Sequence, residues 1–310
     1  DMPLITHDTV QLLNKAAMPN SAMTLLTTTG IPNNGLGRIV RDENGAITRI
    51  VEEADAGDDL LALEEVNSGW YKFEAEWLWN ALPRVKPSTN GELYLTDLAA
   101  RASSEQLIDA VSAPNPEEIL GVNDRIQLSN AENIMRNRIR LRWMRNGVTL
   151  VDPSTTYIDT RVQLSKDVVI KPNTHLVGRS QIGPRCEIGP NSIISDSKIG
   201  EDSNVECSHT DSVKIGARVK VGPFSRLRPG TELSDNVFIG NFAEIKKSRI
   251  GNGSRIGHHS YIGDASLGTR VNIGAGTITC NFDGTSKHKT VIGDEVQIGS
   301  GTMLVAPIKI

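Results

Sequence analysis

The second half of this 310-residue sequence predicts a parallel β-helix, and three observations support that prediction. An aliphatic residue returns at every sixth position from Ile158, a glycine often follows it, and only 4% of all residues are aromatic. A six-residue period fits neither the 3.6-residue repeat of a helix nor the two-residue repeat of a strand. It fits a solenoid in which each six-residue unit forms one flat side of a coil.

Three such sides close a triangular coil of about 18 residues, and stacked coils pair their backbones about 4.8 Å apart. The aliphatic residues then point to the axis and form interior ladders. They are Ile158, Leu164, Ile170, Leu176, Ile182, Ile188, Ile194, Ile199, Val205, Ile215, Val221, Leu227, Leu233, Ile239, Ile245, Ile250, Ile256, Ile262, Leu267, Ile273, Ile292, Ile298, Leu304 and Ile310. This series predicts about eight coils.

The period is interrupted in two ways. The steps 194 to 199, 245 to 250 and 262 to 267 are five residues long, and a longer gap separates Ile273 from Ile292. That gap holds a polar insert, residues 280–289, which cannot belong to the core. We expect it to be a loop that leaves the coil, and such loops often carry the binding face of a solenoid.

The first 150 residues predict an α/β domain. Met23–Thr28 and Ile47–Glu52 have the composition of strands, and residues 74–82, with Trp77 and Leu78 on one side, and 93–102 that of helices. Ser129 and Glu132 have the spacing of a capping box, which predicts a helix from there to Gly147. We expect domains at 1–127 and 151–310, joined by a connecting helix within 128–150.

The connecting helix carries five arginines, which leaves two interpretations open. They indicate either a solvated linker, which we favour, or an anion-binding element. The arginines are Arg136, Arg138, Arg140, Arg142 and Arg145.

Bulk properties exclude several classes of protein. A formal net charge of −4 argues against a nucleic-acid partner. No apolar run approaches the roughly 18 residues of a membrane span, so we expect no membrane partner. The three cysteines, Cys186, Cys207 and Cys280, are far apart, which is typical of reduced thiols in a cytoplasmic protein.

Two cations in the solenoid suggest a binding site. Arg228 and Lys246 each follow an interior aliphatic residue and are 18 residues apart, so they should stack in one column on adjacent coils. Stacked like charges are unfavourable unless an anion lies between them. The alternative is that both are ordinary surface cations with extended side chains.

Three further residues are candidates for chemistry near that column. His258 could serve as a general base near neutral pH, although a lone histidine is more often structural. Asn272 and Asn281 could supply neutral hydrogen-bonding groups. Asparagine is also common at solenoid corners, because it tolerates left-handed backbone angles.

At these residues the sequence resembles one family. The segments that carry the resemblance are 222–230, 240–247, 272–277 and 280–284 in the solenoid, and 1–4, 35–38, 50–52, 65–69 and 121–125 before it. They resemble the bacterial bifunctional N-acetylglucosamine-1-phosphate uridylyltransferase / glucosamine-1-phosphate N-acetyltransferase family. The family's glycine-rich nucleotide loop would fall before Asp1 and its last coils after Ile310, so we expect a piece of a longer protein.

The resemblance implies a left-handed β-helix that acetylates glucosamine 1-phosphate with acetyl-CoA. His258 would be the base that deprotonates the amine. Arg228 and Lys246 would hold the sugar phosphate, and Tyr261 and Asn272 would contact the sugar. The acetyl-CoA site would be lined by Ala275, Asn281, Phe282 and Ser300. Family members are homotrimers with this site between neighbouring β-helices, and their product supplies peptidoglycan and cell-wall synthesis.

For the first domain the resemblance implies a partial Rossmann-like nucleotidyltransferase. It would transfer a uridylyl group from UTP to N-acetylglucosamine 1-phosphate. Mg²⁺ would be bound by Asp1 and Asn123, since an Asp and an amide oxygen suit a hard ion that keeps waters and phosphate oxygens. UDP-N-acetylglucosamine would contact Gly37, Glu52, Asn67 and Asn123.

Two rival functions remain at this stage. One is a sugar-phosphate nucleotidyltransferase whose β-helix only forms oligomers; Arg228, Lys246 and His258 argue against it. The other is a non-catalytic scaffold subunit that uses the β-helix for trimer packing. Consumption of acetyl-CoA that depends on glucosamine 1-phosphate separates the proposed enzyme from the first rival, and acetyl-CoA binding separates it from the second.

Overall fold

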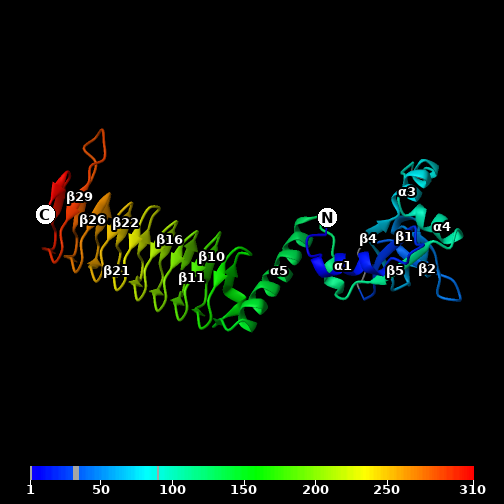
Figure 1. Ribbon diagram of the computed structural model, residues 1–310, viewed down its shortest axis with the longest axis horizontal. Coiled ribbons are helices and arrows are strands. Elements are labelled where there is room, and N and C mark those ends of the chain that lie inside the picture. The colour runs from blue at the N-terminus through cyan, green and yellow to red at the C-terminus, as the bar shows by residue number, and fades with distance from the viewer. Residues whose placement is uncertain (1, 31–34, 89–90) are drawn as a thin grey trace. The chain divides into compact units, whose positions relative to one another are not determined.

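The computed structural model describes residues 2–30, 35–88 and 91–310. The chain divides into two compact units, Asp1–Met135 and Arg136–Ile310 (Figure 1). The boundary between them lies inside a long helix, α5 (Arg125–Arg145).

The first unit is built on a mixed five-stranded sheet with the order β3-β2-β4-β1-β5. Strands β1 and β5 are parallel, whereas the other described pairs are antiparallel, so the parallel arrangement of a complete Rossmann fold is reduced here to one pair. The strands are β1 (Met23–Thr28), β2 (Arg38–Arg41), β3 (Ile47–Val51), β4 (Val66–Phe73) and β5 (Ile108–Ser112). The α-helices are α1 (His7–Ala16), α2 (Asp58–Leu61), α3 (Ala75–Ala81) and α4 (Asp97–Ser104), and the 3₁₀ turns are Glu53–Asp55, Leu82–Arg84 and Pro116–Ile119.

Helices α3 and α4 pack on the sheet through one apolar cluster. Met23 and Leu25 of β1 meet Leu98 of α4 there, and Trp77 and Leu78 of α3 cover its edge. The predictions for the strands at 23–28 and 47–52 and the helix at 74–82 are confirmed within one or two residues.

The helix predicted at 93–102 begins later than expected, at Asp97. Leu93 and Leu95 precede the helix and are exposed. Thr96 precedes the helix and donates a hydrogen bond from Oγ1 to Oε1 of Glu52, 2.6 Å away, which ties the helix start to the sheet.

The capping box predicted at Ser129 is wrong. Helix α5 begins four residues earlier, at Arg125. The carboxylate of Asp124 accepts a hydrogen bond from the backbone N–H of Gln127 (2.7 Å), and Gln127 Oε1 accepts one from the N–H of Asn123 (2.6 Å). An Asp-x-x-Gln pair therefore does the capping, with the same reciprocal logic.

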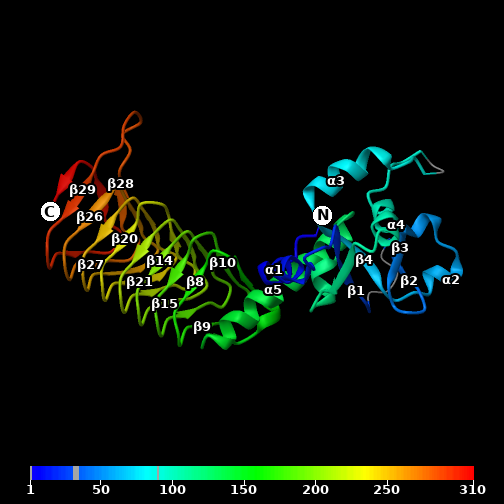
Figure 2. The same ribbon diagram turned by 45° about the vertical axis from the view of Figure 1, so that its right-hand side comes forward.

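The second unit is a parallel β-helix with three faces of nine strands each, as predicted from the six-residue period (Figure 2). The first face holds β6 (Thr149–Leu150), β9 (Val169–Ile170), β12 (Glu187–Ile188), β15 (Asn204–Val205), β18 (Lys220–Val221), β21 (Phe238–Asn241), β24 (Arg255–His258), β27 (Asn272–Ile273) and β30 (Gln297–Ile298). The second face holds β7 (Thr156–Ile158), β10 (Thr174–Val177), β13 (Ile193–Ser195), β16 (His209–Asp211), β19 (Arg226–Leu227), β22 (Glu244–Lys246), β25 (Tyr261–Gly263), β28 (Ile278–Cys280) and β31 (Met303–Val305). The third face holds β8 (Gln163–Leu164), β11 (Gln181–Ile182), β14 (Lys198–Ile199), β17 (Lys214–Ile215), β20 (Glu232–Leu233), β23 (Arg249–Ile250), β26 (Ala265–Leu267), β29 (Thr290–Ile292) and β32 (Ile308–Lys309), and a 3₁₀ turn at Pro153–Thr155 precedes β7.

The predicted interior residues are buried, except the last residue, Ile310. The count of about eight coils was too low, since each face has nine strands. The first coil begins at Thr149, before the first aliphatic residue in the series, and five-residue steps shorten several coils. Two gaps in the aliphatic series are filled by the buried threonines Thr210 and Thr279.

Residues 281–289 leave the coil between β28 and β29, as predicted for the polar insert. This segment is the orange loop that rises away from the stacked coils in Figures 1 and 2. Elsewhere, no helix in the described part of the chain is both long and apolar enough to cross a membrane.

Candidate functional site

His258 belongs to a column of exposed residues on adjacent coils, at the corner between the first and second faces. It is paired in register with Asn241 on the coil before it. Ala275 and Ser300 occupy the same position on the next two coils, two residues beyond the paired Ile256, Ile273 and Ile298. The structure therefore places three sequence-predicted residues, His258, Ala275 and Ser300, in one column. Together with Asn241 they form what we call the histidine column.

The ring of His258 is oriented by Asn241, a residue that the sequence analysis did not select. Its Nδ1 forms a short hydrogen bond with the side-chain Oδ1 of Asn241. An amide oxygen only accepts hydrogen bonds, so Nδ1 carries the proton, and Nε2 of the neutral ring keeps its lone pair. This is the tautomer that a general base needs.

Arg228 directly follows β19 and Lys246 ends the paired strand β22 of the second face, as their 18-residue spacing predicted. Leu227 pairs with Ile245, and the N–H of Arg228 donates to the carbonyl of Ile245 at 2.8 Å. The guanidinium of Arg228, however, turns to Glu244, with Nη1 2.7 Å from Oε1. This hydrogen bond raises the pKa of Arg228. Glu244 was not selected from the sequence, because its role depends on how the Arg228 side chain turns.

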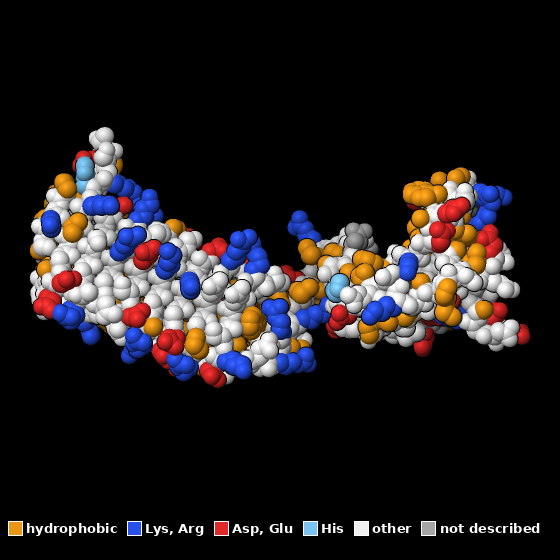
Figure 3. Space-filling model, viewed as in Figure 1, with side chains coloured by type: hydrophobic (Ala, Val, Ile, Leu, Met, Phe, Trp, Pro, Cys, Tyr) orange, Lys and Arg blue, Asp and Glu red, His pale blue; other side chains and the backbone are white. Residues whose placement is uncertain are grey.

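A third cation, Lys287, comes from the loop and lies beside Lys246. Contact with the Lys246 ammonium group lowers the pKa of Lys287, and Asp264 and Tyr261 act on it with the opposite sign. Two ammonium groups this close favour an anion between or beside them. Figure 3 shows Lys and Arg side chains gathered at the base of the protruding loop. The loop insert signalled a binding face, but the sequence did not indicate which lysine returns to the coil.

Tyr261 leans along the second face over the following glycine. A Cβ atom at Gly263 would collide with the Tyr261 hydroxyl, and Gly263 pairs with Lys246. The absent side chain of Gly263 thus lets a phenol lie beside the cations. Arg228, Lys246, Tyr261 and Lys287, with Glu244, form what we call the cation cluster.

Two predicted acetyl-CoA residues lie in the loop and differ in exposure. Asn281 is buried, and its amide nitrogen donates to the carboxylate of Asp264. Phe282 is 58% exposed and forms an isolated bridge with Lys287. In this chain Asn281 anchors the loop base, whereas Phe282 presents an open ring.

Within one chain the histidine column and the cation cluster stand at opposite edges of the second face. His258 ends a strand of the first face, before the corner, whereas Lys246 pairs with the last residue of β25, after the three-residue strand has crossed the second face. Three residues of strand span about 10 Å. Asn272 lies on the first face, paired with Arg255 and Gln297.

In the first unit, three of the four residues expected to contact UDP-N-acetylglucosamine lie together at one end of strands β2, β3 and β4. They are Gly37, Glu52 and Asn67. The N–H of Asn67 donates to the carbonyl of Gly37 (2.8 Å). A Cβ atom at Gly37 would lie 3.4 Å from Oε2 of Glu52 and closer still to Ile50 and Val51. A side chain at position 37 would therefore crowd Ile50, Val51 and that carboxylate.

Tyr71 joins this group and was not selected from the sequence. Its hydroxyl oxygen accepts a hydrogen bond from the side-chain amide of Asn67 at 2.6 Å. Burial raises the pKa of Tyr71 to about 12, and nearby Glu52 acts in the same direction. The phenol thus stays protonated and can donate a hydrogen bond at neutral pH.

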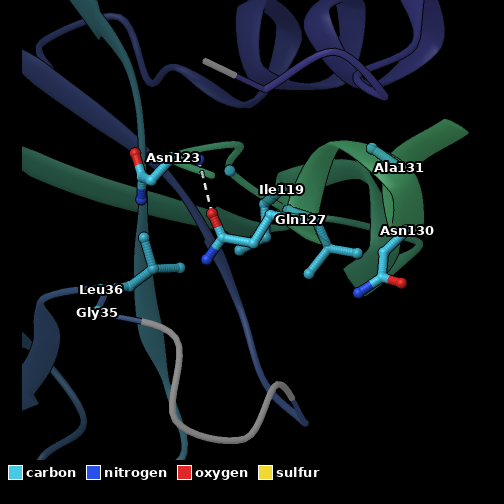
Figure 4. Close-up of a pocket in the computed structure, with 9 residues that line it drawn as sticks. Gly35, Leu36, Ile119, Asn123, Gln127, Asn130 and Ala131 are labelled. Atoms are coloured by element: carbon cyan, nitrogen blue, oxygen red, sulfur yellow. Dashed lines mark hydrogen bonds between the residues drawn. The ribbon is translucent and has the colours of Figure 1, made fainter. Parts of the chain in front are cut away.

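Asn123 lines a separate cavity of about 150 Å³ with Leu36 and Gln127 (Figure 4). Only its backbone N–H makes a hydrogen bond, to Gln127, among the contacts of the described residues, so its amide oxygen can act as a ligand. Asp1, the other expected magnesium ligand, lies outside the described residues. Within residues 2–30, 35–88 and 91–310 no group of three or more His, Cys, Asp or Glu side chains could hold a metal ion.

Comparison with known proteins adds an independent observation. Over its full length the chain is 45% identical to the Bifunctional protein GlmU of Geotalea uraniireducens, of which it covers 69%. It is 44% identical to the Bifunctional protein GlmU of Exiguobacterium sibiricum, of which it covers 70%. Residues 209–308 match the family described as GMPPB C-terminal domain.

Two solved structures were matched to part of this chain. One is a GDP-perosamine N-acetyl transferase from Caulobacter crescentus in complex with CoA and GDP-perosamine, with 17% identity, a TM-score of 0.30, and coverage of 48% of this chain and 66% of that chain. The other is an Arabidopsis UDP-N-acetylglucosamine acyltransferase, with 14% identity, a TM-score of 0.35, and coverage of 53% and 63%.

A solenoid of six-residue repeats with an exposed histidine column and a cation cluster, joined to an α/β unit, defines a transferase of the hexapeptide-repeat class. The sequence identity to curated relatives shows to which family of this class the chain belongs. The chain belongs to the bifunctional GlmU family, and it is a transferase with the acetyltransferase and uridylyltransferase functions of that family.

Proposed function

We propose that the β-helix unit transfers the acetyl group of acetyl-CoA to the amine of glucosamine 1-phosphate. The α/β unit then takes part in uridylyl transfer from UTP to the resulting N-acetylglucosamine 1-phosphate. The observation that supports the first step most directly is the column of Asn241, His258, Ala275 and Ser300, with the ring of His258 held by Asn241. Family membership supports both steps.

In the proposed reaction His258 acts as the general base. Its Nε2 takes a proton from the ammonium group of the sugar, because only the neutral amine attacks a thioester. The nitrogen forms a bond to the acetyl carbon and the carbon–sulfur bond breaks. The proton that the nitrogen loses on becoming an amide neutralises the CoA thiolate, and the imidazolium of His258 returns its own proton to water. The amide of Asn241 accepts from Nδ1–H throughout and stabilises the imidazolium while it holds the proton.

The cation cluster is proposed to bind the phosphate of the sugar. Arg228, Lys246 and Lys287 supply three positive charges, and Glu244 already neutralises part of the first. A bound phosphate would relieve the repulsion between the two lysines, which is where we expect most of the binding energy to arise. Tyr261 and Asn272 would then contact the sugar ring.

Acetyl-CoA is proposed to lie along the upper part of the histidine column. Ala275 and Ser300 are exposed on the two coils that follow His258, and the exposed ring of Phe282 offers an apolar surface. The predicted role of Asn281 is proposed to be indirect, through the loop that it ties to Asp264.

In the α/β unit, Gly37, Glu52 and Asn67 are proposed to contact UDP-N-acetylglucosamine, with Asn123 contributing from the neighbouring cavity. Asn123 and Asp1 would hold Mg²⁺. The ion would neutralise charge on the phosphates of UTP.

A homotrimer is proposed because the two clusters stand at opposite edges of one face. A neighbouring β-helix could bring the cation cluster of one chain to the histidine column of another. A cytoplasmic location is also proposed, and the three free cysteines are consistent with it.

The test is acetyl-CoA consumption by the protein with and without glucosamine 1-phosphate. Release of CoA that depends on the sugar phosphate supports the proposal. Uridylyl transfer without any sugar-dependent CoA release would instead favour the nucleotidyltransferase whose β-helix only forms oligomers.

A further inference from the structure

A second cavity, remote in the solenoid from the histidine column, lies between the end of α5 and the first coils. It has a volume of about 600 Å³, and three arginines line it: Arg142 from the last turn of α5, and Arg161 and Arg179 from the first two coils. The proposed acetyl-transfer site uses none of them. We call this cavity the arginine groove.

The two coil arginines are stacked. Gln163 and Gln181 pair in register, so Arg161 and Arg179, each two residues earlier, occupy the same position on adjacent coils. Adjacent strands are about 4.8 Å apart, a spacing at which like charges repel unless an anion screens them.

None of the three arginines forms an ion pair within the described residues. Two carboxylates on these coils bond to the backbone instead of to the arginine side chains. Asp159 accepts from the N–H of Gly178 (2.8 Å), and Asp196 accepts from the N–H of Arg179 (2.9 Å). A nearby arginine behaves differently, because Arg185 pairs with both Asp202 (2.7 Å) and Glu201 (2.9 Å).

The remaining lining of the groove also favours an acceptor. Asn146, Gln163 and Gln181 offer amide groups. Trp143 also lines the groove, and its ring lies 5.0 Å from the Arg142 guanidinium.

We propose that the arginine groove binds a small polyphosphate anion, either free or as part of a nucleotide. Guanidinium groups bind phosphate oxygens in a bidentate fashion, and three of them match a diphosphate with its several negative charges. A single phosphate would occupy only a small part of 600 Å³. The proposal is independent of the acetyl-transfer reaction and gives the arginine-rich end of α5 a role that a solvated linker lacks.

The test is calorimetric titration of the protein with inorganic pyrophosphate at low salt and without divalent cations, so that metal-dependent nucleotide binding is suppressed. The wild-type protein should bind, and the double variant Arg161→Gln/Arg179→Gln should bind about 10² to 10⁴ times more weakly, since a hydrogen bond to a charged group removes about tenfold to a hundredfold in affinity when lost. The control is Arg185→Gln, which removes an exposed arginine that is already paired and should leave the affinity unchanged. Thermal melts of each variant check that the solenoid is intact.

A parallel titration with UDP distinguishes the two sources of the anion. Tighter binding of UDP than of pyrophosphate, lost in the double variant, assigns the groove to a nucleotide, and equal binding assigns it to the inorganic anion. The proposal is overturned if wild-type and double variant bind pyrophosphate equally. It is also overturned if neither binds, or if Arg185→Gln weakens binding as much as the double variant, which would indicate diffuse charge attraction.

Discussion

Replacement of Asn241 by alanine removes the partner of His258 while leaving the histidine itself in place. In the parent protein Oδ1 of Asn241 accepts from Nδ1 of His258, and the two residues sit in register on adjacent coils. Without that acceptor the ring loses its preferred tautomer, and the imidazolium formed during proton transfer loses a hydrogen bond. Asn241 is therefore a positioning residue, and its loss should act on the chemical step.

The size of the effect follows from the exposure of this pair. Both side chains have access to solvent, so water replaces part of the lost interaction, and a loss of about 1–2 kcal/mol is reasonable for a hydrogen bond that becomes charge-assisted. That corresponds to roughly a 5- to 30-fold drop in kcat for acetyl transfer. Because Asn241 is not expected to touch either substrate, KM for both should change little.

The assay is release of CoA thiol at saturating substrates, measured across pH. Asn241→Asp puts a carboxylate beside the ring and favours its protonated form, so the rising limb of the pH–rate profile should move to higher pH. The control is Asn236→Ala, since Asn236 bonds Arg218 (2.9 Å) rather than a histidine. A wild-type kcat in Asn241→Ala together with an unmoved pH profile in Asn241→Asp would refute the reasoning.

Three further predictions concern the same unit. His258→Ala should lower acetyl transfer by about 10² to 10⁴-fold and leave uridylyl transfer nearly unchanged, and equal rates in mutant and wild type would remove the base assignment. Arg228→Ala and Lys246→Ala should each weaken binding of glucosamine 1-phosphate far more than that of glucosamine, and equal losses for both ligands would contradict a phosphate site. Hydrogen bonds from the backbone of Ser286 and Thr285 and from His288 lower the pKa of Asp283. A carboxylate with a depressed pKa stabilises the fold above its ordinary value of about 3.9 and loses that effect as pH falls. The protection of the 281–289 amides, measured relative to their intrinsic exchange rates at the same pH, should therefore fall in acid and in Asp283→Asn. Unchanged protection in both cases would contradict this.

The solenoid was predictable because its sequence signal is periodic and its contacts are local. Each coil pairs only with its neighbours, so a six-residue period fixes which residues face inward without knowledge of the rest of the chain. The same reasoning placed Arg228 and Lys246 on adjacent coils. The six-residue period did not identify Thr210 and Thr279 as interior residues, because it was followed through aliphatic residues only and these two buried positions hold threonine.

Side-chain partners were not predictable in the same way. The register of the strands determines which backbone segments are adjacent. The side-chain rotamers determine that Arg228 contacts Glu244 and that Asn241 contacts His258. Lys287 reaches Lys246 through a loop whose path no period describes. In the first unit, the start of α5 depended on Asp124 and Gln127, which form a cap without the Ser/Thr–Glu pattern that was sought.

The alternation of inward and outward residues in the solenoid separates folding from chemistry along the chain. Ile256 and Ile262 are fully enclosed, whereas His258, a few positions away, is exposed and Tyr261 is only partly buried. Substitution of the outward residues should therefore alter substrate preference with almost no change in the free energy of unfolding. At the enclosed positions, only aliphatic residues of similar size should be tolerated. In each coil, packing against the neighbouring coils restricts the interior residues, whereas the exterior residues can change and give the site a new substrate specificity.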